Sequence, residues 1–217
     1  MKAVECDLEG REVVARVEAV LARINRTSRA REARAIALIG AKGGVGTSTV
    51  AVNLAILLQQ SEVSVALFDM HHYSGTIAQR LKLTVRTSLA DLLDMEADQI
   101  DGPQIEKRLI RHVSGLRVLA SPATGTGRLE LPPAHAVAIM RSAKTLGDVV
   151  VVDLPHVPSA AVRETLAASE LALLVLGPGP ADMRYAERLL PLLEDAGLSN
   201  EQVYLVVVNR VQGMPSL

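Results

Sequence analysis

The sequence predicts an α/β protein with a doubly wound, mostly parallel sheet. Short apolar runs rich in Val, Leu and Ile recur along the chain with little alternation, which is typical of strands buried on both faces. Helical stretches separate these runs, and alternation of strands with helices favours parallel pairing. The composition, 49% hydrophobic and 22% charged, is that of a globular protein. The expected strands are Ala35–Gly40, Val63–Asp69, Gly115–Ala120, Val149–Asp153, Leu171–Leu176 and Val203–Asn209.

The segment before the first strand is expected to form an N-terminal amphipathic helix. Apolar residues such as Val13, Val17 and Ile24 recur at helical spacing between Leu8 and about Ala30. The end of this segment is basic, with arginines at positions 23, 26, 29, 31 and 34. Such a charge run favours a solvated helix end or linker over a surface that binds DNA or anionic lipid. The chain therefore divides into a helix and basic linker over residues 1–34 and an α/β domain over residues 35–217.

Helices are expected between the strands, and two of them end at a glycine. The expected helices are Ser48–Gln60, Pro133–Leu146, Ala160–Ala168 and Ala181–Ala196. Gly147 and Gly197 follow the last apolar turn of the second and the last of these helices, where glycine stops a helix. Only VQGMPSL follows Asn209 and Arg210, so no helix covers the last strand from that side. This ending predicts either a shorter fold than usual or a domain truncated at its C-terminus.

The composition excludes several classes of protein. The formal net charge of −1 creates no overall field that would attract nucleic acid or membrane. Aromatic residues make up only 2% of the chain, which argues against modules that stack bases. The single Cys6 excludes a disulfide framework and a cysteine-based zinc site. Because the N-terminus is too charged for a signal peptide and no long apolar run follows, we expect a cytoplasmic protein.

The most informative stretch is the glycine-rich loop over residues 39–49. It follows an expected strand and opens an expected helix, which is the context that a phosphate-binding loop requires. Gly43, Gly44 and Gly46 allow backbone N–H groups to point inward, and the helix N-terminus favours an anion. Ser48 is placed to offer its hydroxyl to Mg²⁺. We favour phosphate binding over a ligand-free strand-to-helix turn.

KGGVGTST in this loop resembles the deviant Walker A motif, K-G-G-x-x-K-[ST], of the ParA/MinD family. Lys42, the glycines and Ser48 match the motif, but Thr47 stands where the ordinary phosphate-loop lysine should be. The resemblance implies a fold of the P-loop NTPase type that binds ATP or ADP with Mg²⁺. It also implies a homodimer in which Lys42 reaches the phosphates of the partner. Without the charge of a lysine at position 47, weaker nucleotide binding is expected.

The resemblance extends over about residues 35–210 and implies further site residues. The nucleotide-binding residues would be Lys42, Gly43, Gly44, Val45, Gly46, Thr47, Ser48, Thr49, Asn209 and Arg210, and the metal-binding residues would be Ser48, Asp69 and Asp153. Lys42, Asp69 and Asp153 are the candidates for catalysis. The acid that positions the attacking water in the family is replaced by His71, which implies at most a weak ATPase.

Within this family the chain looks most similar to the TadZ/CpaE branch, which localises Flp-type pilus machinery. The phrases KGGVGTSTVAVNLA, SLADLL, SGLRVLASP and VVVDLP carry this likeness. The branch implies a polar location and a pilus or secretion-machinery protein as partner. The branch usually carries a receiver-like domain before the loop, whereas a helix of about 30 residues is expected here, and no amphipathic anchor like that of MinD is expected after residue 210. Two alternatives remain open: an active ATPase for DNA partition or division-site placement, and an interaction scaffold that binds no nucleotide.

Three histidines follow the ends of strands that should face the nucleotide. His71, His72 and His156 could bind a transition metal, but no carboxylate at metal-ligand spacing reinforces them. Solvent-facing loop histidines are therefore favoured over a metal site. Asp69 lies two residues before His71, so an extended chain would direct both side chains the same way.

Overall fold

One eight-stranded sheet organises the computed structural model, which describes residues 2–6, 15, 19, 32–73, 75–122 and 130–209. The strands are β1 (Lys2–Cys6), β2 (Arg34–Gly40), β3 (Val65–Asp69), β4 (Ile110–Arg111), β5 (Arg117–Leu119), β6 (Val149–Leu154), β7 (Leu171–Leu176) and β8 (Val203–Val208). Their order across the sheet is β1-β8-β7-β2-β6-β3-β5-β4, and only β4 runs antiparallel to its neighbour. The predicted fold class, α/β with a doubly wound and mostly parallel sheet, is confirmed.

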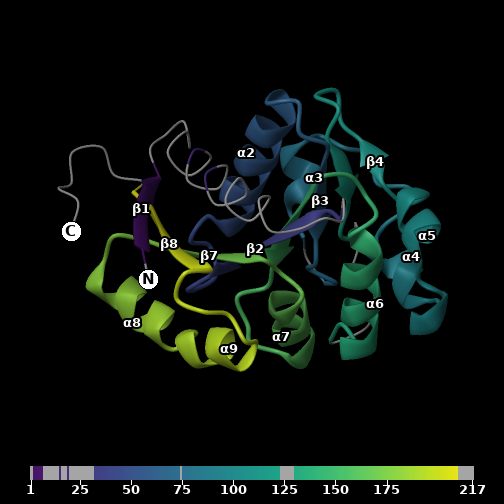
Figure 1. Cartoon of the computed structure of the whole chain (residues 1–217). Coiled ribbons are helices and arrows are strands. Elements are labelled where there is room, and N and C mark those ends of the chain that lie inside the picture. The colour runs from purple at the N-terminus through teal and green to yellow at the C-terminus, as the bar shows by residue number, and fades with distance from the viewer. Residues whose placement is uncertain are drawn as a thin grey trace.

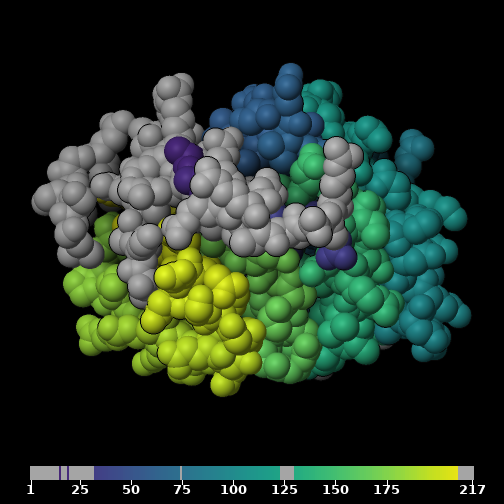
Figure 2. Space-filling model, viewed as in Figure 1, coloured from purple at the N-terminus to yellow at the C-terminus, as the bar shows by residue number. Residues whose placement is uncertain are grey.

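The helices cover both faces of this sheet (Figure 1). They are α2 (Thr47–Gln60), α3 (Ile77–Arg80), α4 (Leu89–Leu93), α5 (Gly102–Glu106), α6 (Pro133–Ala143), α7 (Ala160–Ala167), α8 (Pro180–Glu187) and α9 (Leu190–Asp195). The buried side chains form two clusters, one beneath α2 and α3 and the other beneath α4 to α9. In the space-filling view, α2 (blue) accordingly lies at the top and the region of α8 and α9 (yellow-green) at the bottom (Figure 2).

The central strands are buried on both faces, as the apolar runs predict. Every residue of β3, β6 and β7 is buried. Each of the six expected strands is present, with ends shifted by a few residues. The run 115–120, for example, contributes only Arg117–Leu119 to the ladder.

Two strands were not expected from the sequence. β1 pairs in parallel with β8, Lys2 opposite Tyr204 and Cys6 opposite Val208. It therefore shares the sheet with the α/β domain, although the sequence analysis placed residues 1–34 in a helix and linker. Charged residues at positions 2 and 5 hide its strand character, and its partner lies about 200 residues further along the chain. β4 has two residues and leaves no periodic signal.

The single helix expected over Ala181–Ala196 is wrong, because the structure contains two helices there. α8 ends at Glu187 and α9 begins at Leu190, with Pro191 in its first turn. Proline has no N–H to donate, and its ring collides with the carbonyl four residues earlier, so a continuous helix would be interrupted at this point. Proline is tolerated in the first turn of a helix, and that is where the chain restarts.

Some expectations concern residues that the structure does not describe. Apart from Ala15 and Ala19, which are helical, the helix expected over residues 8–30 lies outside the described residues. The same holds for the arginines at positions 23, 26, 29 and 31 and for Arg210. Among the described residues, no helix combines the length and the apolar character needed to cross a membrane.

The sheet brings distant segments together at one edge. β2, β6 and β3 are neighbours and run in parallel, so their carboxyl ends lie side by side. The register places Asp153 of β6 opposite both Leu38 of β2 and Asp69 of β3. The chain segments that follow these strands meet above this edge, where ligands of open α/β sheets commonly bind.

Candidate functional site

A glycine-rich loop joins β2 to α2 and forms one wall of the site. Gly44 (φ 74°) and Gly46 (φ 117°) adopt left-handed backbone conformations that favour glycine. Gly40 is tightly enclosed, since a Cβ atom there would lie 2.4 Å from Oγ1 of Thr47. α2 begins directly after the loop, so the unpaired N–H groups of its first turn lie next to the loop. This arrangement favours an anion at the loop.

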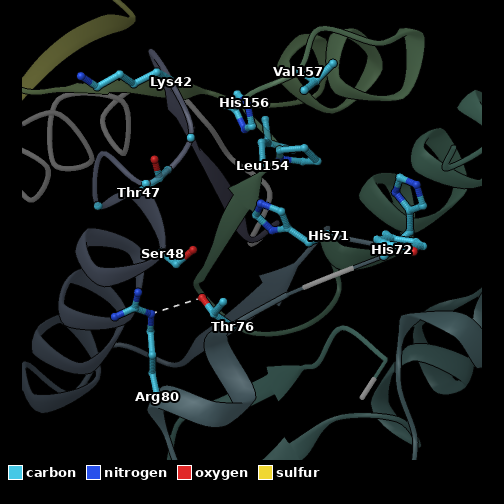
Figure 3. A pocket seen from close by; sticks show the side chains of 15 residues that line it. Lys42, Thr47, Ser48, His71, His72, Thr76, Arg80, Leu154, His156 and Val157 are labelled. Carbon is cyan, nitrogen blue, oxygen red and sulfur yellow. Dashed lines mark hydrogen bonds between the residues drawn. The ribbon is translucent and has the colours of Figure 1, made fainter. Parts of the chain in front are cut away.

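A cavity of about 500 Å³ opens beside the loop (Figure 3). Its walls come from the segments that follow β2, β3 and β6. The lining residues are Lys42, Gly43, Gly44, Gly46, Thr47, Ser48, His71, His72, Tyr73, Thr76, Arg80, Leu154, Pro155, His156 and Val157. The volume is in the range of small-molecule binding sites.

The structure separates the residues that the resemblance assigns to nucleotide binding. Those that line the cavity are Lys42, Gly43, Gly44, Gly46, Thr47 and Ser48. Val45 is buried beneath the loop, against the core on the α2 side. Thr49 is exposed on α2, and Asn209 follows β8, and neither residue is part of the cavity lining.

Arg80 is a cavity residue that the sequence analysis missed. It ends α3, and its side chain extends toward Ser48 (Figure 3), with Nε donating to Oγ1 of Thr76 at 3.2 Å. Its positive charge also acts on Asp153 and opposes part of the rise in the pKa of that buried carboxyl group. α3 has only four residues, so no periodic pattern in the sequence indicates where Arg80 points. The structure thus places a cation at the cavity although Thr47 supplies none.

Lys42 is held by an acid of its own chain. Its side chain points away from Ser48 in Figure 3, and Nζ forms an ion pair of 2.7 Å with Oδ1 of Asp182 in α8. Asp182 is 7% exposed. The chain before α8 passes close to this carboxylate, because a Cβ atom on Gly177 would lie 2.9 Å from Oδ2 of Asp182. This ion pair competes with any contact that Lys42 would make with another subunit.

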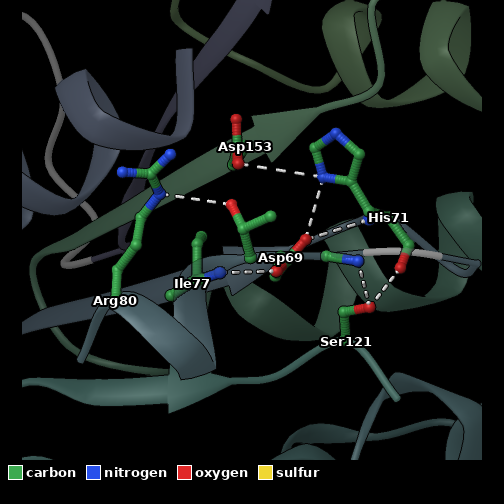
Figure 4. A network of polar contacts seen from close by, with 8 residues as sticks. Asp69, His71, Ile77, Arg80, Ser121 and Asp153 are labelled. Carbon is green, nitrogen blue, oxygen red and sulfur yellow. Dashed lines mark hydrogen bonds and ion pairs between the residues drawn. The ribbon is translucent and has the colours of Figure 1, made fainter. Parts of the chain in front are cut away.

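Asp69, His71 and Asp153 form a polar cluster (Figure 4), in which His71 lines the cavity and the two carboxylates are buried beside it. Nδ1 of His71 lies 2.9 Å from Oδ1 of Asp69 and 3.7 Å from Oδ2 of Asp153. Both carboxylates are fully buried. The contact between Asp69 and His71 confirms that these two side chains point the same way.

The cluster changes the pKa values of two of its members. Burial raises the pKa of Asp153 to about 7; the charge of Asp69 adds to this rise, whereas His71, the Ser48 hydroxyl and Arg80 oppose it. Burial alone would lower the pKa of His71, but the hydrogen bond and charge of Asp69, with the charge of Asp153, raise it. Near neutral pH the cluster therefore retains protons that the same groups would release in water.

Ser121, which follows β5, positions the segment that carries His71. Its hydroxyl donates to the carbonyl oxygen of His71 and accepts from the backbone N–H of Gly75 at 2.9 Å (Figure 4). The N–H of Ile77 donates to Oδ2 of Asp69 at 3.3 Å. Gly75 must be a glycine, since a Cβ atom there would lie 2.1 Å from Oδ2 of Asp69. Neither Ser121 nor Gly75 stands out in the sequence, because the contacts of Ser121 are long-range and the constraint on Gly75 is steric.

The expectation that the histidines are solvent-facing is wrong for His71. Two carboxylates flank its ring, and only 23% of its side chain is exposed. Sequence spacing does not reveal Asp153 as a neighbour of His71, because Asp153 lies on another strand and is adjacent only in the folded sheet. His156 is exposed, as expected.

The oxygen donors at the cavity fit a hard divalent cation such as Mg²⁺. Ser48 lines the cavity, and the carboxylates of Asp69 and Asp153 lie beneath it. Neither carboxylate oxygen of Asp153 has a hydrogen bond of normal geometry among the described residues, so a cation would satisfy a buried acid. Bound there with a nucleotide, Mg²⁺ would neutralise phosphate charge, and Ser48, Asp69 and Asp153 would hold it.

Comparisons with known proteins agree with this geometry. A family model described as "ParA: NUBPL iron-transfer P-loop NTPase" matches residues 32–108. The antiactivator FleN of Pseudomonas aeruginosa is 27% identical over 77% of this chain and 59% of its own length. The septum site-determining protein MinD of Thermotoga maritima is 27% identical over 81% of this chain and 63% of its own length. The chain thus spans about three fifths of these relatives.

Solved structures show the same fold. A ParA family ATPase from Chlorobium tepidum superposes with a TM-score of 0.73 at 23% identity, over 85% of this chain and 76% of its own. MinD of Pyrococcus horikoshii, determined with Mg-ADP, superposes with a TM-score of 0.67 at 18% identity, over 84% of this chain and 72% of its own.

A glycine-rich loop between a strand and a helix, beside a cavity at the carboxyl ends of parallel strands, is the arrangement typical of nucleotide sites of the P-loop class. Within that class, the chain shares its fold with ParA/MinD-type P-loop NTPases, and the matched stretches of its sequence are similar to theirs.

Proposed function

We propose that this protein is a nucleotide-dependent positioning protein. It binds ATP or ADP with Mg²⁺ in the cavity beside the glycine-rich loop and hydrolyses ATP slowly or not at all. The observation that carries this proposal is the combination of an intact loop geometry with Thr47 and His71 at two positions where catalysis requires other residues. The bound nucleotide serves to assemble the protein rather than to drive rapid turnover.

Slow hydrolysis follows from the groups that surround the cavity. Phosphoryl transfer depends on a positioned water and on charges that stabilise the developing negative oxygens. Thr47 contributes no charge, and Lys42 is paired with Asp182. Where the family places a water-orienting acid, the Nδ1 atom of His71 is already engaged by Asp69 at 2.9 Å.

The biological role that we propose is the localisation of Flp-type pilus machinery at a cell pole, as in the TadZ/CpaE branch. The likeness of the sequence phrases and the two substituted positions support this branch. An active ATPase for DNA partition or division-site placement shares the fold but needs a lysine at position 47 and an acid at position 71. The names antiactivator FleN and septum site-determining protein MinD describe those relatives and leave both roles open.

Nucleotide binding is tested by titration calorimetry with Mg-ATP and Mg-ADP. The wild type should bind both, and Arg80→Ala should weaken binding by roughly tenfold, because a charge-assisted contact to phosphate is lost. Arg86→Ala is the matched control, since Arg86 is exposed and lies outside the cavity. Absence of binding at millimolar nucleotide would establish the scaffold alternative instead.

Dimerisation is expected to depend on Lys42 and to be opposed by Asp182. In analytical ultracentrifugation with Mg-ATP, Lys42→Ala should lower the dimer fraction, because the cation that reaches the partner is lost. Asp182→Asn should raise the dimer fraction, because it weakens the contact that holds Lys42 in its own chain. Lys107→Ala, an exposed lysine on another surface, should have no effect. A dimer fraction that is the same in all four proteins would reject this role of Lys42.

A further inference from the structure

The cluster of Asp69, His71 and Asp153 contains a nitrogen donor as well as two carboxylates. One donor atom from each residue lies within 4.8 Å of the other two. Nδ1 of His71 is 2.9 Å from Asp69 and 3.7 Å from Asp153. Among the described residues, this is the group of histidine and acidic side chains whose donor atoms converge in this way.

Asp153 provides a second and independent sign of a ligand. Its side chain is 0% exposed, and neither carboxylate oxygen makes a hydrogen bond of normal geometry within the described part of the chain. A buried carboxylate without such bonds carries an unfavourable desolvation free energy. The carboxylate lies near the end of β6, with Oδ2 3.7 Å from Nδ1 of His71 (Figure 4). A cation at the centre of the cluster would remove this penalty.

We propose that Asp69, His71 and Asp153 form a binding site for a divalent transition metal ion, with Zn²⁺ bound far more tightly than Mg²⁺. An imidazole nitrogen suits Zn²⁺ and its transition-metal neighbours, whereas Mg²⁺ prefers oxygen ligands and gives up its water reluctantly. Three protein ligands, of which His71 lines the cavity, leave a coordination position open for water or another molecule. The replacement of an acid by His71 therefore changes which metal the site selects.

The distances suit such an ion after small adjustments. An ion about 2.1 Å from each donor keeps the donors roughly 3.0–3.5 Å apart. The separations of 2.9 and 3.7 Å bracket this range. The ligands are also held from outside the cluster: Ser121 fixes the backbone of His71, and the N–H of Ile77 fixes Oδ2 of Asp69. Such supporting contacts orient metal ligands.

This inference goes beyond the proposed function, because all three ligands belong to the protein and no phosphate is needed. Asp69 and Asp153 are shared with the site proposed for Mg²⁺ in the nucleotide complex, so the two ions would compete. If Zn²⁺ is bound here, the negative charges of Asp69 and Asp153 are already neutralised before a nucleotide binds.

The test is metal binding by the chelator-treated full chain, without affinity tag and without nucleotide. Zn²⁺ affinity is measured by competition with a chromophoric chelator, and Co²⁺ provides visible absorption bands that report its ligands. The wild type should bind one ion per chain. His71→Asn should weaken Zn²⁺ binding on the order of a hundredfold. Loss of a residue that only orients a metal ligand can already weaken metal affinity by that much, and His71 would itself be a ligand. His156→Ala removes an imidazole from the same cavity and should leave the affinity unchanged within about twofold.

Several results would overturn the inference. One is that the wild type fails to bind one Zn²⁺ ion per chain, and another is that His71→Asn binds Zn²⁺ as tightly as the wild type. A third such result is that His156→Ala loses as much Zn²⁺ affinity as His71→Asn. Circular dichroism confirms that the variants are folded, and if His71→Asn does not fold, Asp153→Asn replaces it with the same expected loss. Mg-ATP binding is measured separately on metal-free protein. Loss of Zn²⁺ binding alone would reject the metal site, whereas loss of Mg-ATP binding alone would reject the proposed function.

Discussion

Thr47→Lys is expected to tighten the binding of Mg-ATP by roughly tenfold to a hundredfold. A charge-assisted hydrogen bond to phosphate is worth on the order of 1.5–3 kcal/mol, which corresponds to this change in affinity. Position 47 is the first residue of α2 and lines the cavity, so the new ammonium group can reach the bound phosphates. Calorimetry of wild type and variant measures the difference.

The same substitution should change ATP turnover much less than affinity. Hydrolysis also needs an acid to orient water, and His71 stands at that position with its ring against Asp69. Phosphate release under saturating Mg-ATP is therefore compared for wild type, Thr47→Lys, and Thr47→Lys combined with His71→Asp. Only the double variant is expected to gain substantial turnover.

Thr49→Lys is the matched control, because Thr49 lies on the same helix but is exposed and outside the cavity. It should alter neither affinity nor turnover. A wild type that already turns over at about 1 s⁻¹ or faster, the range of ordinary enzymes, would contradict the proposal of a slow nucleotide switch.

Asp153→Asn is expected to stabilise the metal-free and nucleotide-free protein at pH 8 by on the order of a few kcal/mol. The pKa of Asp153 is about 7 in the folded chain, against 3.8 for an ordinary aspartate. At pH 8 the wild type must therefore keep a buried carboxylate ionised, whereas an amide carries no charge. Urea unfolding in the presence of a chelator, at several pH values between 5 and 8, measures this difference.

The direction of the pH dependence follows from proton binding. Between pH 4 and 7 the folded state retains the proton of Asp153 that the unfolded chain has released, so the free energy of unfolding falls as pH rises. His71 acts in the same direction, because its raised pKa contributes stability below pH 6.5 that is lost as pH rises through the folded value. The wild type should lose stability from pH 5 to pH 8, and Asp153→Asn should lose less.

Asp195→Asn removes an exposed carboxylate on α9 and should leave the pH profile of the wild type unchanged. Parallel profiles for wild type and Asp153→Asn would show that Asp153 is ionised at all these pH values. The raised pKa would then be wrong.

Local sequence patterns predicted most of the sheet and one wall of the site. Continuous apolar runs such as Leu171–Leu176 are buried on both faces, and burial of that kind leaves a plain signal in the residues themselves. The loop residues Gly44 and Gly46 were predictable for a similar reason, because their left-handed backbone requires glycine. Thr47 and His71 could be identified from the sequence only because they differ from the residues that the family motif has at these positions.

The sequence by itself determined the fold class, the geometry of the glycine-rich loop and the absence of a charge at position 47, since each depends on neighbours close in the chain. Only the tertiary structure decided which groups surround the cavity. β6 brings Asp153 against Asp69 and His71, α3 delivers Arg80, and α8 places Asp182 on Lys42. These contacts join segments that are far apart in sequence, and their energies depend on burial and on distances between charges. Neither quantity exists until the sheet has formed.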